Sequence, residues 1–241
     1  MTFTLLALDR AAGLVGAVTA SRSLAVGNAV LAIDPAVGAV ASQAWTNRAL
    51  RGRMLDALAA GESPEAVVRR VTEWDEKPGL RQTAALDLTG RTGAWVGSRT
   101  SAWTGQRQGV DYVTVGNLLT GQDVLDAVAD SFERGGADAG ESENSRTRPV
   151  AAFARRLLAA LHAGQSAGGD ARGRQSAAVL VSRKQEFRMH PAEFAIDLRV
   201  DDHTHPVDEL DRLLELRIRD LDEDLVSGAP SETGTEDASA G

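Results

Sequence analysis

The hydrophobic positions of the chain follow two different periods, and the period changes several times along the sequence. Short runs in which apolar residues are adjacent or alternate predict buried β-strands. These runs cover residues 2–8, 14–20, 28–33, 37–42, 82–88, 92–97, 112–115, 175–182 and 194–200. The first two runs are separated by a short polar turn and therefore predict a β-hairpin at the start of the chain.

Between these strands, apolar residues recur at i, i+3 and i+4, which predicts amphipathic helices over residues 47–60, 63–74, 121–134, 149–162 and 206–225. Ser63 and Pro64 mark one helix start, because serine can cap a helix and proline suits its first turn. The first four helices come in pairs, which argues against a parallel βαβ sheet. We therefore predict an α/β (α+β) fold with two antiparallel sheets stacked face to face between helical layers.

Two segments lack a hydrophobic pattern. Residues 135–148 are rich in glycine, serine and glutamate and are expected to form a mobile surface loop. Residues 226–241 are acidic and small, and are expected to form a disordered tail. Residues 1–225 are predicted to be one domain, because 241 residues suffice for one core and are few for two.

Composition argues against several classes of function. The formal net charge is -8, whereas a nucleic-acid-binding protein normally presents a basic face. Cysteine is absent, which excludes disulfides, thiolate metal sites and a cysteine nucleophile. The N-terminal segment has no basic region and its apolar run ends at Asp9, so we expect neither a signal peptide nor a membrane span. We expect a cytoplasmic protein without a cofactor.

Thr2 is the first candidate for chemistry. A small second residue normally lets methionine aminopeptidase remove Met1, and Thr2 would then carry both a hydroxyl and a free α-amino group. The pKa of an α-amino group is about 7.7–8.0, so this amine can act as the general base for the hydroxyl beside it. Threonine is also a common second residue without any role, but a position at the start of a buried strand strengthens the catalytic interpretation.

Several motifs spread along the chain point to one family. They are residues 20–22 with 25–27, 38–44 with 46–47, 115–117, 167–177 and 197–203. Together they resemble the uncharacterised microbial family called domain of unknown function 1028. The opening segments 2–5 and 19–28 also resemble N-terminal nucleophile (Ntn) hydrolases such as proteasome β subunits. The resemblance implies a four-layer αββα fold and an ancestry among amide-bond hydrolases. Our leading hypothesis is an Ntn-type hydrolase in which Thr2 attacks a small amide or peptide-like substrate.

The resemblance also implies two further catalytic residues. In proteasome-like enzymes an aspartate and a serine before a late strand lie beside the nucleophile, and Asp170 and Ser176 are the candidates here. Asn117 follows Gly116 at the end of a strand, where its amide can help to form an oxyanion hole. The alternative for Asn117 is a turn residue, because Gly-Asn is common in turns.

The segment 168–176 is the densest polar motif of the chain. Its glycines allow the backbone to approach a ligand closely, and Arg172 and Arg174 can bind a carboxylate or phosphate. We assign substrate binding to four residues, which are Arg22, Arg172, Arg174 and Gln175. The motif is not a phosphate-binding P-loop, because the Gly-Lys-Ser/Thr ending is absent. The alternative is a structural loop with an internal salt bridge to Asp170.

Two departures from the family pattern favour a second hypothesis. Proteasome-like enzymes use a lysine near the nucleophile, but no lysine occurs between Thr2 and Lys77, and arginine cannot act as a base. The family also often has cysteine and histidine in the region of residues 100–106, and this chain has neither there. The alternative is therefore a catalytically inactive ligand-binding or scaffold protein.

Two other features remain open. Asp201, Asp202 and His203 could bind a divalent metal in a third type of hydrolase, but Asp202 or Thr204 can equally cap the helix that follows. We assign no metal. The apolar face formed by Leu210, Leu213 and Leu214 either packs on a sheet of the same monomer or mediates homo-oligomerisation.

Overall fold

The computed structural model describes residues 2–135 and 147–227, with side chains as far as Glu223. Most of the expected loop 135–148 and nearly all of the expected tail 226–241 lie outside the described residues. No helix in the described part of the chain is long and apolar enough to cross a membrane.

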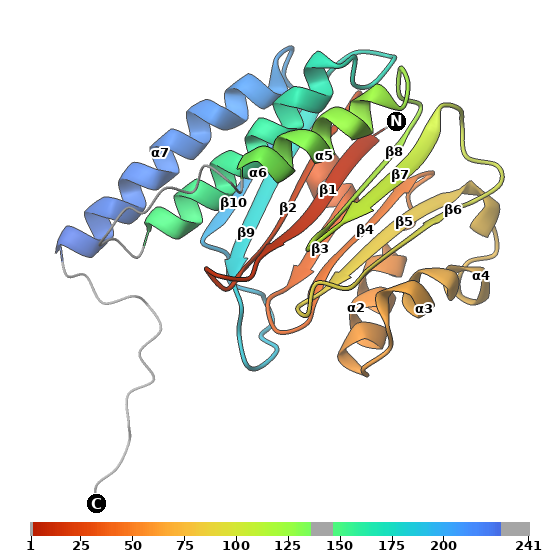
Figure 1. Cartoon of the computed structure of the whole chain (residues 1–241), viewed down its shortest axis with the longest axis horizontal. Coiled ribbons are helices and arrows are strands. Elements are labelled where there is room, and N and C mark those ends of the chain that lie inside the picture. The colour runs from red at the N-terminus through yellow and green to blue at the C-terminus, as the bar shows by residue number, and fades with distance from the viewer. Residues whose placement is uncertain (1, 136–146, 228–241) are drawn as a thin grey trace, which may run out of the picture.

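Two antiparallel sheets lie face to face in the centre of the molecule (Figure 1). The larger sheet has the strand order β10 (Ile196–Val200), β9 (Ser176–Arg183), β2 (Leu14–Ser21), β1 (Thr2–Asp9), β8 (Tyr112–Asn117) and β7 (Thr104–Gly109). The smaller sheet has the order β3 (Leu31–Asp34), β4 (Gly38–Ala44), β5 (Arg81–Asp87) and β6 (Thr92–Val96). As predicted, β1 and β2 form the opening hairpin.

Helices cover the outer face of each sheet (Figure 1). The larger sheet is covered by α5 (Asp123–Gly135), α6 (Arg148–Ser166) and α7 (Pro206–Ser227). The smaller sheet is covered by α2 (Ala49–Ala59) and α3 (Pro64–Arg69), which α4 (Val71–Trp74) follows. Ser63 caps α3 as predicted, since its hydroxyl accepts a hydrogen bond from the Ala66 amide at 3.3 Å. The fold is the predicted four-layer αββα sandwich.

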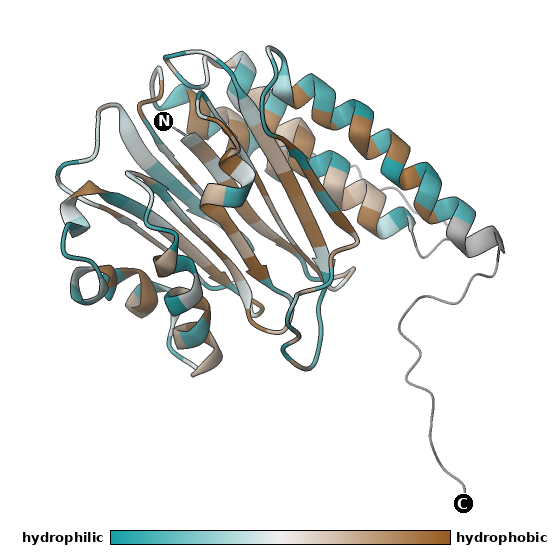
Figure 2. Cartoon of the chain, turned by 180° about the vertical axis from the view of Figure 1, so that it is seen from behind, coloured by the Kyte–Doolittle hydropathy of each residue, from teal (hydrophilic) through white to brown (hydrophobic). Residues whose placement is uncertain are grey.

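Strand β1 divides the core into layers because successive side chains point to opposite faces of a sheet. Phe3 and Leu5 pack against the helices on the larger sheet, whereas Leu6 and Leu8 pack against the smaller sheet. A third apolar cluster lies beneath α2 and α3. Figure 2 shows the hydrophobic colour concentrated along the central strands. By this alternation, Thr2 lies on the face of β1 that looks toward the smaller sheet, at one end of the space between the sheets.

The structure differs from the sequence prediction in three elements. Residues 26–30, predicted in part as strand, form the short helix α1 (Val26–Val30). Val26 and Val30 are buried one helical turn apart, and Gly27 lies so close to β9 that an added Cβ would be 2.4 Å from the Cβ of Ala178. The predicted helix 63–74 is divided at Arg70. Strand β7 is not predicted, because it is a polar edge strand with exposed glutamines.

The start of α3 packs closely against Gly93 of β6. A Cβ at this position would lie 2.4 Å from the carbonyl oxygen of Pro64, which is backbone and cannot move aside easily. We therefore expect Gly93→Ala to lower the free energy of unfolding by about 1–3 kcal/mol, the usual cost of overpacking. Gly52→Ala in α2 is the control, because nothing lies within 4 Å of its added Cβ. Urea titration should show the control as stable as wild type or more so; equal midpoints for both variants would contradict the prediction.

Candidate active site

A row of polar side chains crosses the larger sheet at the end of the space between the sheets. In the strand register Thr2 is opposite Asn117, Asn117 is opposite Thr104, and Ser21 is opposite Ser176. Residues opposite each other in antiparallel strands point to the same face. The hydroxyl of Thr2 donates to the hydroxyl of Ser21 at 3.3 Å, which joins the two halves of the row.

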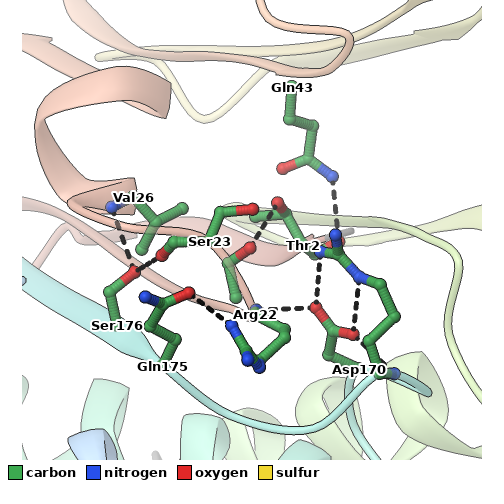
Figure 3. Close-up of polar contacts among 10 residues, drawn as sticks. Thr2, Arg22, Ser23, Val26, Gln43, Asp170, Gln175 and Ser176 are labelled. Carbon is green, nitrogen blue, oxygen red and sulfur yellow. Dashed lines mark hydrogen bonds and ion pairs between the residues drawn. The ribbon is translucent and has the colours of Figure 1, made fainter. Parts of the chain in front are cut away.

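Thr2 is held from both sheets. Its side chain is in the row of the larger sheet, and its carbonyl oxygen accepts a hydrogen bond from the Gln43 amide of β4 at 3.3 Å. Figure 3 shows Thr2 between Gln43 on one side and Arg22 and Asp170 on the other. Thr2 is 5% exposed and is therefore buried. These contacts from both sheets hold Thr2 in place.

Gln82 of β5 is the centre of a buried amide network beneath Thr2. Its Nε2 donates to the carbonyl oxygens of Gly105 and Gly116, both at 2.9 Å. Its Oε1 accepts from the Gln43 amide at 2.8 Å and from the Asn117 amide at 3.0 Å. Every hydrogen-bonding position of the Gln82 amide is therefore used, without any charged group.

The two backbone carbonyls determine how each amide in this network is oriented. Carbonyl oxygens only accept, so Gln82 must direct its NH₂ group toward them and its Oε1 toward Gln43 and Asn117. Asn117 must consequently present Nδ2 to Gln82. An amide nitrogen carries two hydrogens, and the described contacts of Asn117 use one of them. The second is a donor available next to Thr2.

Asp170 and Ser176 lie close to Thr2, but their polar atoms bond to the neighbouring loops. The Asp170 carboxylate accepts from the backbone amides of Arg22 at 2.7 Å and Arg172 at 2.9 Å, and it forms an ion pair with the Arg172 guanidinium at 3.2 Å. The Ser176 hydroxyl accepts from the Val26 amide at 3.1 Å and donates to the Ser23 carbonyl. Both residues thus fix the loops around the row.

The four predicted substrate-binding residues separate into two groups. Arg172 is paired with Asp170 and belongs to the loop structure. Arg22, Arg174 and Gln175 line a pocket of about 390 Å³, together with Asp202, His203 and Thr204. The pocket adjoins the row of polar side chains, because Gln175 directly precedes Ser176. The backbone amide of Gln175 also donates to the backbone carbonyl of Ser21 at 3.0 Å. The predicted residues therefore come together at one end of the molecule.

A match of the chain to a protein-family model decides its membership. The model describes a family of unknown function, DUF1028, and matches residues 2–210. The chain is a member of the DUF1028 family. Protein SPO2555 from Silicibacter pomeroyi, a DUF1028 protein of known crystal structure, is 33% identical with a TM-score of 0.74, and the match covers 89% of this chain and 88% of that one.

Other comparisons add little about function. Anbu, the ancestral beta-subunit from Yersinia bercovieri, is 11% identical over 97% of this chain and 98% of its own, with a TM-score of 0.34. A score this low does not support an argument. No curated protein matches the DUF1028 chain.

Three residues of this DUF1028 site were not found by sequence reasoning: Ser21, Gln43 and Gln82. Each is polar, and each is at most 2% exposed. Gln43 and Gln82 are direct register partners in β4 and β5. The signal in the sequence was a polar residue near the end of an otherwise apolar strand. That signal does not indicate which other strand supplies the hydrogen-bond partner of the polar residue.

The metal hypothesis receives no support from the described residues of the DUF1028 chain, where no group of three or more histidine, cysteine, aspartate or glutamate side chains could hold a metal ion. His203 Nδ1 instead accepts a hydrogen bond from the backbone amide of His205 at 3.0 Å. The Asp202 carboxylate accepts a hydrogen bond from the Gln175 side-chain amide, also at 3.0 Å. These contacts shape the loop before α7.

An ion pair holds the strand ends that carry Gln43 and Gln82. Arg81 Nε lies 2.8 Å from the Asp75 carboxylate, and the Arg81 guanidinium also donates to the Trp45 carbonyl. The hydrogen bond from Arg81, aided by Asn47 and the Lys77 amide, lowers the pKa of Asp75 from 3.8 to about 2, although burial opposes the shift. The Asp75 side chain is only 3% exposed, so solvent screens this pair little.

This lowered pKa predicts a loss of stability in acid. A carboxyl group whose folded pKa is depressed stabilises the fold above its unfolded pKa and loses that contribution as the pH falls through the folded pKa. For Asp75 we expect about 2 kcal/mol to be lost between pH 5 and pH 2. In urea titrations at several pH values, Asp75→Asn should remove this part of the acid dependence and Asp220→Asn, on the exposed face of α7, should not. An unchanged pH profile in Asp75→Asn would refute the assignment.

Proposed function

We propose that this DUF1028 protein is an Ntn-type hydrolase of a small amide or peptide-like substrate, with Thr2 as its N-terminal nucleophile. The observation that carries the proposal is the position of the Thr2 hydroxyl. It lies at the start of β1, on the face toward the smaller sheet and 3.3 Å from the Ser21 hydroxyl, and Asn117 is the register partner of Thr2 on β8. The αββα fold is the fold that the resemblance to Ntn hydrolases implies.

The proposed reaction begins after removal of Met1. The Thr2 α-amine takes the proton of the Thr2 hydroxyl, whose oxygen attacks the carbonyl carbon of the substrate amide. The second Asn117 Nδ2 hydrogen, with nearby backbone amides, stabilises the oxyanion that forms. The C–N bond breaks when the α-amine gives its proton to the departing amine. Water then hydrolyses the ester on Thr2 by the same groups in reverse.

Ser21, Asp170 and Ser176 have supporting parts in this proposal. The Ser21 hydroxyl accepts from Thr2 and can orient its hydroxyl. Asp170 and Ser176 hold the loops that flank the nucleophile, through the backbone amides of Arg22 and Val26. These residues position the reacting groups and do not exchange protons with the substrate.

A ligand-binding protein without catalysis is the second candidate function. One observation favours it: the chain has two lysines, and neither matches the lysine of proteasome-like enzymes. Lys184 donates to the Leu88 carbonyl at the far end of the sandwich, and Lys77 is exposed before β5. The nucleophile would then depend on its own amine alone for activation.

Covalent labelling discriminates between the two candidates. A β-lactone acylates an activated hydroxyl by ring opening, so each reacted site adds the full mass of the probe. We expect one adduct per chain, located on Thr2 by peptide mapping in protein whose intact mass shows loss of Met1. Thr2→Ala should not be labelled, and Thr2→Ser should be. Absence of labelling at Thr2 in the Met1-free protein would reject the hydrolase in favour of the ligand-binding protein.

A further inference from the structure

The pocket beside the row of polar residues is lined by two arginines, Arg22 and Arg174. Arg22 follows Ser21 directly, and its Nη1 donates to the Gln175 side-chain oxygen at 2.7 Å. Gln175 is itself fixed, because its Nε2 donates to Asp202 at 3.0 Å and its carbonyl accepts from the His203 amide at 2.8 Å. The Arg22 guanidinium is therefore held in place before any ligand arrives, which reduces the entropy cost of binding.

Neither arginine is neutralised within the described part of the chain. Arg172, two residues before Arg174, is paired with Asp170, whereas no described acidic side chain lies within ion-pair distance of Arg22 or Arg174. Asp202 is the one acidic residue among the residues that line the pocket. Two guanidinium groups and one carboxylate leave one net positive charge in the pocket.

We infer that this pocket binds a carboxylate group of the substrate, which makes the substrate an N-acyl amino acid or the C-terminal residue of a peptide. A guanidinium presents parallel N–H groups that match the two oxygens of a carboxylate. One net positive charge suits a monoanion, and the Asp202 carboxylate disfavours the higher charge of a phosphate dianion. The inference rests on the proposed function for the reaction, but the binding site itself does not require catalysis.

The position of the pocket explains why the carboxylate would be close to the scissile amide. Arg22 and Ser21 are adjacent in the chain, with Cα atoms about 3.8 Å apart, and the Ser21 hydroxyl contacts Thr2. A substrate anchored by Arg22 and Arg174 would hold its carboxylate beside the strand end that carries Ser21. In an N-acyl amino acid the amide nitrogen is two bonds from the carboxylate carbon, so the carboxylate and the scissile amide lie close together.

Calorimetric titration of the Thr2→Ala protein tests the pocket without turnover. The probes are N-acetylglycine, the uncharged N-acetylglycinamide and inorganic phosphate. We expect saturable binding of N-acetylglycine, and affinities at least about tenfold lower for the other two, because charge-assisted hydrogen bonds to the carboxylate would be lost or strained. Equal binding of N-acetylglycinamide, equal binding of phosphate, or no saturable binding of N-acetylglycine would overturn the inference.

Variants of the two arginines locate the site. Arg22→Gln and Arg174→Gln should each weaken N-acetylglycine binding about tenfold. Arg69→Gln is the matched control, because Arg69 is also exposed but lies on α3, on the other side of the molecule. Thermal unfolding shows whether each variant remains folded. Unchanged affinity of folded Arg174→Gln for N-acetylglycine would overturn this inference, whether or not Thr2 is labelled. Conversely, absence of β-lactone labelling at Thr2 would reject the proposed hydrolase but would not change the result on carboxylate binding.

Discussion

Inserting a lysine between Met1 and Thr2 is expected to lower the rate of β-lactone labelling at Thr2 by about 10²–10⁴-fold, the usual contribution of a general base. The insertion changes the second residue from a small one to a large one, so Met1 is retained. Thr2 keeps its hydroxyl, but its nitrogen becomes a peptide amide and can no longer accept a proton. The measurement is the rate at which the intact mass of the protein increases by one probe mass.

This insertion is more informative than removal of the Thr2 hydroxyl, because it removes the free α-amine and keeps the hydroxyl. It therefore tests the role of the amine separately from that of the hydroxyl. The Thr2→Ser protein, which retains both groups, is the positive control, and a thermal unfolding midpoint near that of wild type shows that the insertion is tolerated. Labelling at the wild-type rate in the insertion variant would mean that the amine is not the base. The base would then have to come from another residue.

The layers of the fold could be predicted from the sequence, because the pattern of apolar residues that identifies a buried strand or an amphipathic helix lies within the element itself. The hairpin of β1 and β2 has its turn bounded by Asp9 and Leu14, and nearly every residue within its strands is buried. Helix α3 begins where Ser63 and Pro64 indicate. The prediction was wrong for residues 26–30, where a contact between Gly27 and Ala178, far apart in the sequence, decides the local structure.

The candidate site could be predicted only in part for the same reason. Thr2 and Asn117 were found from the start and end of strands, and Asp170 and Ser176 from the resemblance. Some of the contacts that hold Thr2 come from β4 and β5 of the opposite sheet, through Gln43 and through Gln82, which binds Gln43. No local pattern connects these strands to β1, because the partnership arises only when the two sheets stack.

The neutral character of this network has a consequence for mechanism. Asp170, the buried carboxylate near Thr2, is offset by the Arg172 guanidinium and by two backbone amides. The described polar groups beneath Thr2 are amides and hydroxyls, including Thr4, whose hydroxyl lies 2.7 Å from the Gln43 side-chain oxygen. Such groups orient Thr2 but do not exchange protons near neutral pH. The α-amine of Thr2 is therefore the group on which the proposed activation depends.

Gln82→Leu is expected to lower the free energy of unfolding by about 3–5 kcal/mol, because several buried partners would lose their hydrogen bonds together and each costs about 1–3 kcal/mol. These partners are the carbonyls of Gly105 and Gly116 and the amides of Gln43 and Asn117. Gln106→Leu, at an exposed glutamine of β7, is the control and should change stability by less than about 0.5 kcal/mol. Urea titration measures both variants.

A second readout asks whether the network also positions the nucleophile. In the fraction of Gln82→Leu that remains folded, Met1 should still be removed, since the second residue is unchanged. The rate of β-lactone labelling should nevertheless fall, because Gln43 and Asn117 would no longer be fixed around Thr2. A folded Gln82→Leu protein that is labelled at the wild-type rate would mean that the network stabilises the sandwich without serving the nucleophile. Stability within about 1 kcal/mol of wild type would mean instead that the amides find other partners, and that their observed orientation around Thr2 is not enforced.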